Sequence, residues 1–298
     1  MDDFLYEVVE ITQTIWDGVL FGSTYALIGI GFTLIFGAMG KLNMAYAGAA
    51  IAGAYVGLAV SMFFDAPIIL VFAVSALVST LMGYIVYQTC FRFIPTNNHL
   101  AALMASVGGL FLIDELIVLA TRGSPMNFPG LFEDAYFEIG PFGIRGDLLF
   151  VFFIGIVSTV VLLYVLFKTR LGMATRAVAQ QDVAAQLCGI NIHRTNSITF
   201  SIAGLLGGIA GAMTAAAVGV LSPVMTVPLT IKGLIVTVIG GLGSIPGAII
   251  AGLFVGAFEN FFLYIRGIDE RDMYVVALLF IFLVFRPNGI FSKTITRD

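Results

Sequence analysis

Three carboxylates lie within runs that are otherwise apolar enough to cross a membrane. Asp114 and Glu115 interrupt LFLIDELIV, and Glu259 lies in GAFENFF near the end of a later run. Ionisable side chains within spans are costly, so each is a candidate for function, such as a proton or cation relay. The alternatives are an interfacial position or a hydrogen-bonded partner for Asp114 and Glu115, and capping or interfacial anchoring for Glu259. Lys232, near an outer edge, is expected to snorkel to the interface.

A second candidate is a glycine-rich stretch with the sequence GGLGSIPGAIIAG, residues 240–252. Hydrocarbon offers no water to freed backbone groups, so a broken helix survives only against protein or a wet cavity. Transporters place their pathway at such breaks, although small residues also let two helices pack closely. We favour the pathway and expect it to be lined by Gly240, Gly241, Gly243, Ser244, Pro246 and Gly247. The helix beginning near Ser244 would offer free N–H groups to a carboxylate.

A third candidate is the polar segment 168–195, which holds four of the chain's 14 lysines and arginines. Its alanines and glutamines predict a short helix from Met173 to Leu187, ended by Gly189. A merely solvated connector would carry more lysine and glutamate. Docking of a soluble partner is therefore favoured, on a smooth surface of exposed alanines: Ala177, Ala184 and Ala185.

The elements that position these residues are predicted to be membrane-spanning helices. The 298 residues are 59% hydrophobic and only 11% charged, against about 25% charged in soluble domains. Mean hydropathy is +1.04. The acidic start MDDFLYEVVE lacks the positive region of a signal peptide, so the first span should remain in the protein. Apolar runs predict a polytopic all-α fold of about 8–9 crossings, at 17–38, 44–63, 67–88, 100–120, 148–167, 196–219, 231–243, 245–262 and 273–286.

The distribution of lysine and arginine orients these spans. With the N-terminus outside, nine of the 14 cations fall inside: Lys41, Arg92, Lys168, Arg170, Arg176, Arg194, Arg286, Lys293 and Arg297. The long connection 121–147 is then an outer loop and 168–195 an inner one. The run 231–243 is short for a full crossing and either begins near Val224 or is half a helix. A single crossing by the glycine-rich pair would put the C-terminus outside.

Several kinds of chemistry have no support in the sequence. The chain contains no phosphate-binding lysine loop, no HExxH, no GxSxG and no clustered metal ligands. Cys90 and Cys188 flank probable inner loops, which argues against a disulfide or a thiolate metal site. His99 and His193 are expected to be ordinary interfacial residues. We therefore expect no enzyme activity, and no metal or cofactor bound by this chain.

Three separated motifs resemble one family of transport proteins. They read GSTYALIGIGFTLIFGAMGKLNMA (22–45), RAVAQQDVAAQLCGIN (176–191) and VIGGLGSIPGAIIAGLFVGAFEN (238–260), followed by RPNGIF (286–291). In this order they are similar to the permease of a branched-chain amino acid ABC importer, of the LivH type. The likeness runs over nearly the whole chain, although permeases for urea, short amides and other amino acids look similar.

The resemblance implies a type II importer permease, a single transmembrane domain over residues 1–298 of a multi-pass inner-membrane protein. Residues 172–190 would form a coupling helix that receives a cytoplasmic ATPase, which uses the ATP. A periplasmic binding protein would deliver substrate, and a second permease, identical or related, would complete the pore. The coupling residues would be Arg176, Gln181, Asp182, Ala185 and Gly189.

The chain departs from its family at two places. Relatives commonly read FAHGE after the first asparagine, where this chain has MAYAG, so Tyr46 and Gly48 replace a histidine and a glutamate. Asp114 and Glu115 fall where relatives often carry uncharged amides. We predict that Asn43 and Tyr46 line the pathway. The alternative functions are an importer of urea or short amides, and an ion-coupled secondary transporter that uses Asp114 or Glu115.

Overall fold

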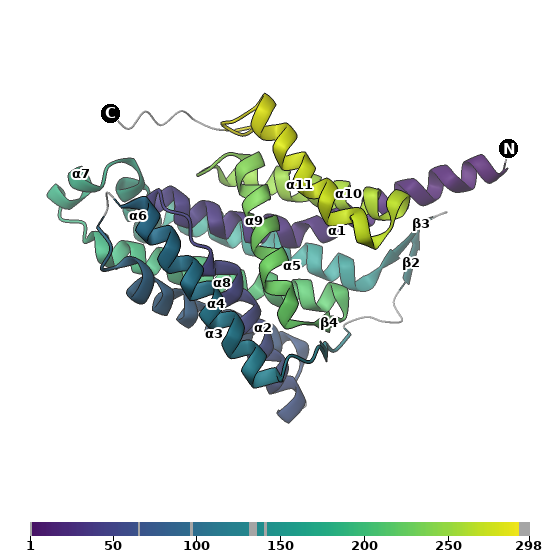
Figure 1. Ribbon diagram of the computed structural model, residues 1–298, viewed down its shortest axis with the longest axis horizontal. Coiled ribbons are helices and arrows are strands. Elements are labelled where there is room, and N and C mark those ends of the chain that lie inside the picture. Colours follow the sequence, from purple (N-terminus) through teal and green to yellow (C-terminus); the bar gives the residue numbers. More distant parts are fainter. Residues whose placement is uncertain (1, 65, 96–97, 131–135, 140–141, 292–298) are drawn as a thin grey trace.

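A computed structural model describes residues 2–64, 66–95, 98–130, 136–139 and 142–291 of the chain. Long helices dominate these residues (Figure 1). They are α1 (Asp2–Met39), α2 (Ala45–Phe64), α3 (Ile68–Val86) continued by the π-helical turn η1 (Tyr87–Phe91), α4 (His99–Thr121), α5 (Gly146–Lys168), α8 (Ile192–Val218), α9 (Thr226–Gly240), α10 (Ile245–Arg266) and α11 (Ile268–Phe285).

Eight helices of the described chain have the length and composition to cross a membrane. They lie in eight of the nine predicted runs, and the prediction of a polytopic all-α protein is confirmed. The ninth run, 273–286, falls in α11, whose role as a crossing stays a prediction. So do the outside position of the N-terminus and the inside position of Lys293 and Arg297, which lie outside the described residues.

Helix α1 lies at the centre of the bundle, and α4 and α5 lie at its edge. The most apolar window of α1 is 83% buried, whereas the corresponding windows of α4 and α5 are each 28% buried. Helix α1 packs against α5, α8, α9 and α10, and most extensively against α10. A span surrounded by other helices needs small residues where backbones meet, since lipid tails are as apolar as leucine and only close packing favours association.

Glycines at four-residue spacing form the contact between α1 and α10. A Cβ atom built on Gly18 would lie 2.7 Å from the carbonyl oxygen of Gly256, and one on Gly22 would lie 2.8 Å from that of Gly252. A Cβ on Gly252 would meet the backbone of Ala26. These glycines are packing residues, because no larger side chain fits there without moving a helix backbone.

Substitution of Gly252 by alanine is expected to lower the free energy of unfolding by about 1–3 kcal/mol, the usual cost of overpacking. Gly108 in α4 is the matched control, since a Cβ atom there would have no neighbour within 4 Å. Gly108→Ala should be neutral or stabilising by about 0.5–1 kcal/mol, because alanine restricts the unfolded chain. SDS unfolding titrations of both variants check this, and equal effects would contradict the packing argument.

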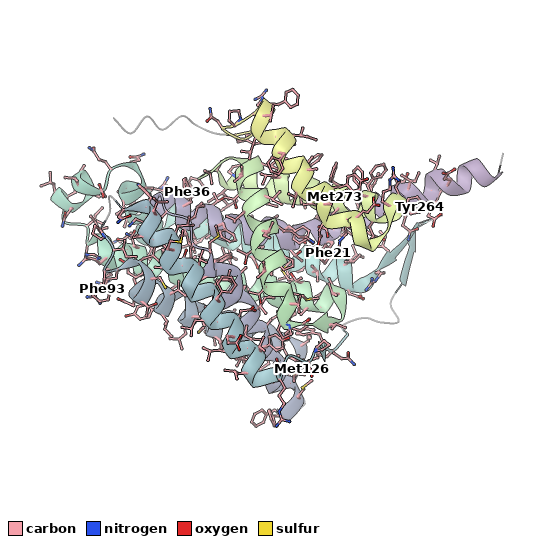
Figure 2. All side chains as sticks on the ribbon, viewed as in Figure 1. Phe21, Phe36, Phe93, Met126, Tyr264 and Met273 are labelled. Atoms are coloured by element: carbon pink, nitrogen blue, oxygen red, sulfur yellow. The ribbon has the colours of Figure 1, made fainter. Side chains whose placement is uncertain are left out.

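Short helices and short strands occupy opposite ends of the bundle (Figure 1). At one end lie α6 (Arg170–Gln180) and α7 (Asp182–Leu187), and at the other lie β1 (Met126–Asn127), β2 (Tyr136–Ile139), β3 (Phe142–Arg145) and β4 (Val220–Leu221). Antiparallel pairing joins β1 to β4, with Met126 opposite Leu221, and β2 to β3, with Tyr136 opposite Arg145. Figure 2 shows Phe93 at the first end and Met126 at the second. The described parts of segments 121–147 and 168–195 thus lie at opposite ends of the bundle. The charge distribution predicts opposite sides of the membrane for these two segments.

Candidate functional site

The glycine-rich stretch forms a tight turn between two spans. Helix α9 ends at Gly240 and α10 begins at Ile245. Gly241 and Gly243 adopt φ values of 101° and 87°, which only glycine reaches without strain. Ser244 caps α10, its Oγ accepting a hydrogen bond from the Gly247 N–H at 3.3 Å. The run 231–243 is the later part of a longer span that begins near Val224, the first of the two alternatives left open for it, because a 3-10 turn, η2 (Pro223–Met225), leads into α9 and gives a span of 18 residues.

The segment after α11 packs onto this turn. The Ile290 N–H donates to the Ile239 carbonyl at 2.9 Å, and the Phe291 N–H donates to the Gly240 carbonyl at 3.2 Å. These two bonds satisfy carbonyls at the C-terminal end of α9 that have no partner within the helix. Residues 286–291, which the sequence comparison with the family identified only as its final motif, therefore hold the turn in place.

A cavity of about 480 Å³, here named the turn cavity, lies between this turn and α6. The turn contributes Gly243, Ser244 and Pro246 to its walls, and α6 contributes Arg176. Helices α1 and α5 and the side chain of Phe291 complete the lining. The cavity thus brings together residues predicted for the pathway and a residue predicted for ATPase coupling. Such proximity could not be deduced from the sequence, where the two segments are far apart.

The other predicted pathway residues lie within the protein rather than along this cavity. Asn43 is 3% exposed, and its Oδ1 accepts a hydrogen bond from the Ala45 N–H at 3.1 Å, at the start of α2. Tyr46 is 2% exposed and packs edge-on against Phe32, with its hydroxyl in the space left by Gly31. Beside Asn43, burial lowers the pKa of the Lys41 ammonium, which donates to the Pro95 carbonyl at 3.1 Å.

The inner segment forms two helices where the sequence predicts one. The expected helix from Met173 to Leu187 is interrupted at Gln181, whose backbone is extended (φ −158°, ψ 109°). The Asp182 carboxylate accepts a hydrogen bond from the Val183 N–H at 2.8 Å, and this local bond competes with continuation of the helix. Gly189, at φ 82°, follows the end of α7 as predicted.

The surface of α6 and α7 differs in part from the expected surface of exposed alanines: Ala184 is exposed as expected, Ala177 is partly buried, and larger apolar side chains are exposed among polar ones. Ala185, expected to be exposed, is buried to 4% exposure beneath α7. Met173 and Val183 are each 61% exposed, and Leu187 is 86% exposed. We name these three side chains the α6–α7 face. Helical spacing explains why Ala185 is buried, because it lies on the side of α7 opposite Val183 and Leu187.

The two carboxylates of α4 have different surroundings. Asp114 is partly buried, and its Oδ1 has no hydrogen-bond partner in the described structure. Glu115 is exposed on the outward side of α4. They therefore point in different directions, as the helical angle between neighbours predicts.

Glu259 belongs to a buried cluster of charges that the sequence did not predict. Its Oε1 lies 2.8 Å from the Lys232 Nζ and 3.1 Å from the Arg271 Nε. The Lys232 Nζ also lies 3.0 Å from Asp272 Oδ1 and 3.4 Å from the Tyr25 hydroxyl. With exposures of 7% and 1%, Lys232 does not snorkel and Glu259 is neither a cap nor an interfacial anchor. The cluster, here named the charge cluster, joins α1, α9, α10 and α11.

The family model described as branched-chain amino acid transport system / permease component matches residues 14–285. The chain belongs to this permease family. Its match covers every element described above except the N-terminal part of α1 and the last residues of the chain.

Curated relatives match the permease over most of its length. The high-affinity branched-chain amino acid transport system permease protein BraD of Pseudomonas aeruginosa is 30% identical, over 96% of this chain and 97% of its own. LivH of Escherichia coli is 28% identical over 98% and 97% of the two chains. The ribose import permease RbsC of Escherichia coli is 29% identical over 64% and 61%. The resemblance found in the three motifs is confirmed.

In the described parts of the permease, no three His, Cys, Asp or Glu side chains gather as metal ligands. Lys232 and Glu259, in neighbouring apolar runs, were the sequence signal for the charge cluster. Two opposite charges within spans indicate a mutual partner as readily as they indicate two separate anchors.

Proposed function

We propose that the permease passes branched-chain or other hydrophobic amino acids through the inner membrane of the cell, driven by ATP hydrolysed on separate cytoplasmic subunits. A periplasmic binding protein delivers the amino acid to the outer side, where 121–147 forms a loop. A second permease, identical or related, completes the pore. The chain itself binds no cofactor and carries out no catalysis. The observation that carries this proposal is the apolar α6–α7 face.

Exposed apolar side chains on these two helices require a protein partner. Helix α6 carries Arg170, Arg176 and Gln180 and lies at the end of the bundle, so it belongs in water and not in lipid. In water, large apolar side chains at 61–86% exposure favour burial against a partner. An ATPase that buries Val183 and Leu187 on its surface would bind and push on α7 at the same time.

A displacement of α6 and α7 by the ATPase can reach the membrane helices at two places. The Thr175 hydroxyl lies 3.3 Å from the Thr199 hydroxyl and links α6 to α8. The turn cavity links Arg176 to Ser244, where α9 and α10 meet. We propose that these two links rock the helix pairs between two arrangements, which alternating access requires. Asn43, Tyr46 and the turn would border the path as it opens.

The test is uptake of leucine into liposomes that contain the permease, its ATPase and its binding protein. Uptake should require ATP and should be insensitive to ionophores. Asp114→Asn and Glu115→Gln, introduced separately, should leave it within about twofold of wild type, since neither carboxylate has a role in ATP coupling. Uptake driven by a proton gradient without ATP, and lost in either amide variant, would instead establish an ion-coupled transporter. ATP-driven uptake of urea but not leucine would correct the substrate alone.

A further inference from the structure

A cation, the exposed side chain of Arg176, lines the turn cavity. The Arg176 guanidinium carbon lies 5.1 Å from the centroid of the Phe167 ring, and its Nε donates to the Gly172 carbonyl at 3.4 Å. Among the described residues, no carboxylate lies within 4.0 Å of Arg176, and none lines the cavity. Such a cavity carries an unbalanced positive charge.

Two further groups in the cavity favour an anion. The 22-residue helix α10 begins there, with Ser244, Ile245 and Pro246 in the lining, and a helix N-terminus carries about half a positive charge. Thr33 also lines the cavity, is 1% exposed, and its Oγ1 has no hydrogen-bond partner. A buried hydroxyl without a partner is costly unless a ligand or water supplies one.

The remaining walls suit a small apolar body. They include Leu34, Leu166 and Phe291, and the volume of about 480 Å³ lies within the range of about 300–1,000 Å³ typical of small-molecule sites. Apolar walls with a few convergent polar groups are the usual composition of such sites.

We propose that the turn cavity binds a small hydrophobic monoanion, a carboxylate of branched-chain size that lacks an ammonium group. The carboxylate would pair with Arg176 near the start of α10, and the alkyl chain would contact the apolar walls. A zwitterionic amino acid fits less well, because the described lining places its ammonium near the exposed cation Arg176 and offers it no carboxylate. The ligand therefore differs in charge from the amino acid proposed as the transported substrate.

Occupancy would strengthen the connection between two elements that face each other across the turn cavity. The ligand would contact α6, which we propose is pushed by the ATPase, and the turn that joins α9 to α10. This consequence rests on the proposed function, whereas binding itself does not. The experiment therefore measures binding to the permease alone, so that failure of transport and failure of the site are distinguishable.

The test is calorimetric titration of the purified permease in nanodiscs of neutral phosphatidylcholine. The probes are 4-methylpentanoate, leucine and 4-methylpentanamide, which share an alkyl body and differ in charge. We expect 4-methylpentanoate to bind at least about tenfold more tightly than the other two, since a charge-assisted hydrogen bond contributes more than a neutral one. Arg176→Gln should weaken its binding by about tenfold or more, and Thr33→Val by a few-fold.

Arg170→Gln is the matched control, because Arg170 is exposed on the same helix and does not line the cavity. It should leave binding of 4-methylpentanoate within about twofold of wild type. Equal affinity for leucine and 4-methylpentanoate in the wild-type permease, or no binding of either, would overturn the proposal without any variant. Loss of 4-methylpentanoate binding in nanodiscs that contain phosphatidylglycerol would also overturn it, since the occupant would then be a lipid headgroup.

Discussion

Glutamate in place of Leu187 is expected to reduce ATP-driven uptake by more than about tenfold while the permease remains folded. Leu187 is 86% exposed at the end of α7, and Val183, one helical turn earlier, is 61% exposed. Residues four apart share a helix face, so the two side chains can enter one pocket of a partner. Loss of a buried anchor at an interface typically costs about 2 kcal/mol or more, which corresponds to roughly 30-fold in affinity.

Gln186→Glu is the matched control for this variant. Gln186 is exposed on the same short helix, and the substitution introduces the same charge without removing an apolar contact. The measurement is retention of the ATPase on immobilised permease, followed by leucine uptake in liposomes. Retention should fall for Leu187→Glu and stay near wild type for Gln186→Glu. Full retention and full uptake by Leu187→Glu would show that the α6–α7 face is not where the ATPase docks.

The spans were predictable from the sequence because a bilayer imposes a length and an apolar composition on each helix. The packing contact between α1 and α10 also has a sequence pattern, because four-residue spacing places Gly18 with Gly22 and Gly252 with Gly256 on one face of each helix. Helix ends were less predictable. For the run 231–243 the sequence left two alternatives open, because Pro223 and Thr226, which begin the continuous helical span, are not strongly apolar.

The site was only partly predictable, since it depends on contacts between distant segments. Arg176 and Ser244 were candidates from separate segments, and no local pattern placed them on one cavity. Ala185 was misplaced because the prediction assumed one straight helix, whereas the break at Gln181 resets which residues of α7 face the bundle. The position of Lys232 was predicted wrongly because the lysine was considered alone and was therefore expected to reach the interface. Its ionic partner, Glu259, lies on the next helix.

The charge cluster makes a strong prediction about stability. Glu259→Met should lower the free energy of unfolding by roughly 3–5 kcal/mol, because removing one partner leaves a buried charge uncompensated. The Lys232 side chain is 8% exposed, and its other ionic partner, Asp272, is 56% exposed and so better solvated than Glu259. Thermal or SDS unfolding in micelles measures the loss.

The double variant Lys232→Met with Glu259→Met distinguishes charge from packing. Methionine fills a similar volume in both places, and Arg271 keeps Asp272 as a partner at 3.5 Å. Replacing both members of a buried ion pair by apolar residues is often neutral or stabilising. The double variant should therefore recover most of the stability that Glu259→Met loses. If its loss equals or exceeds that of the single variant, the cluster stabilises α9, α10 and α11 by geometry that methionine cannot replace, and the electrostatic explanation is wrong.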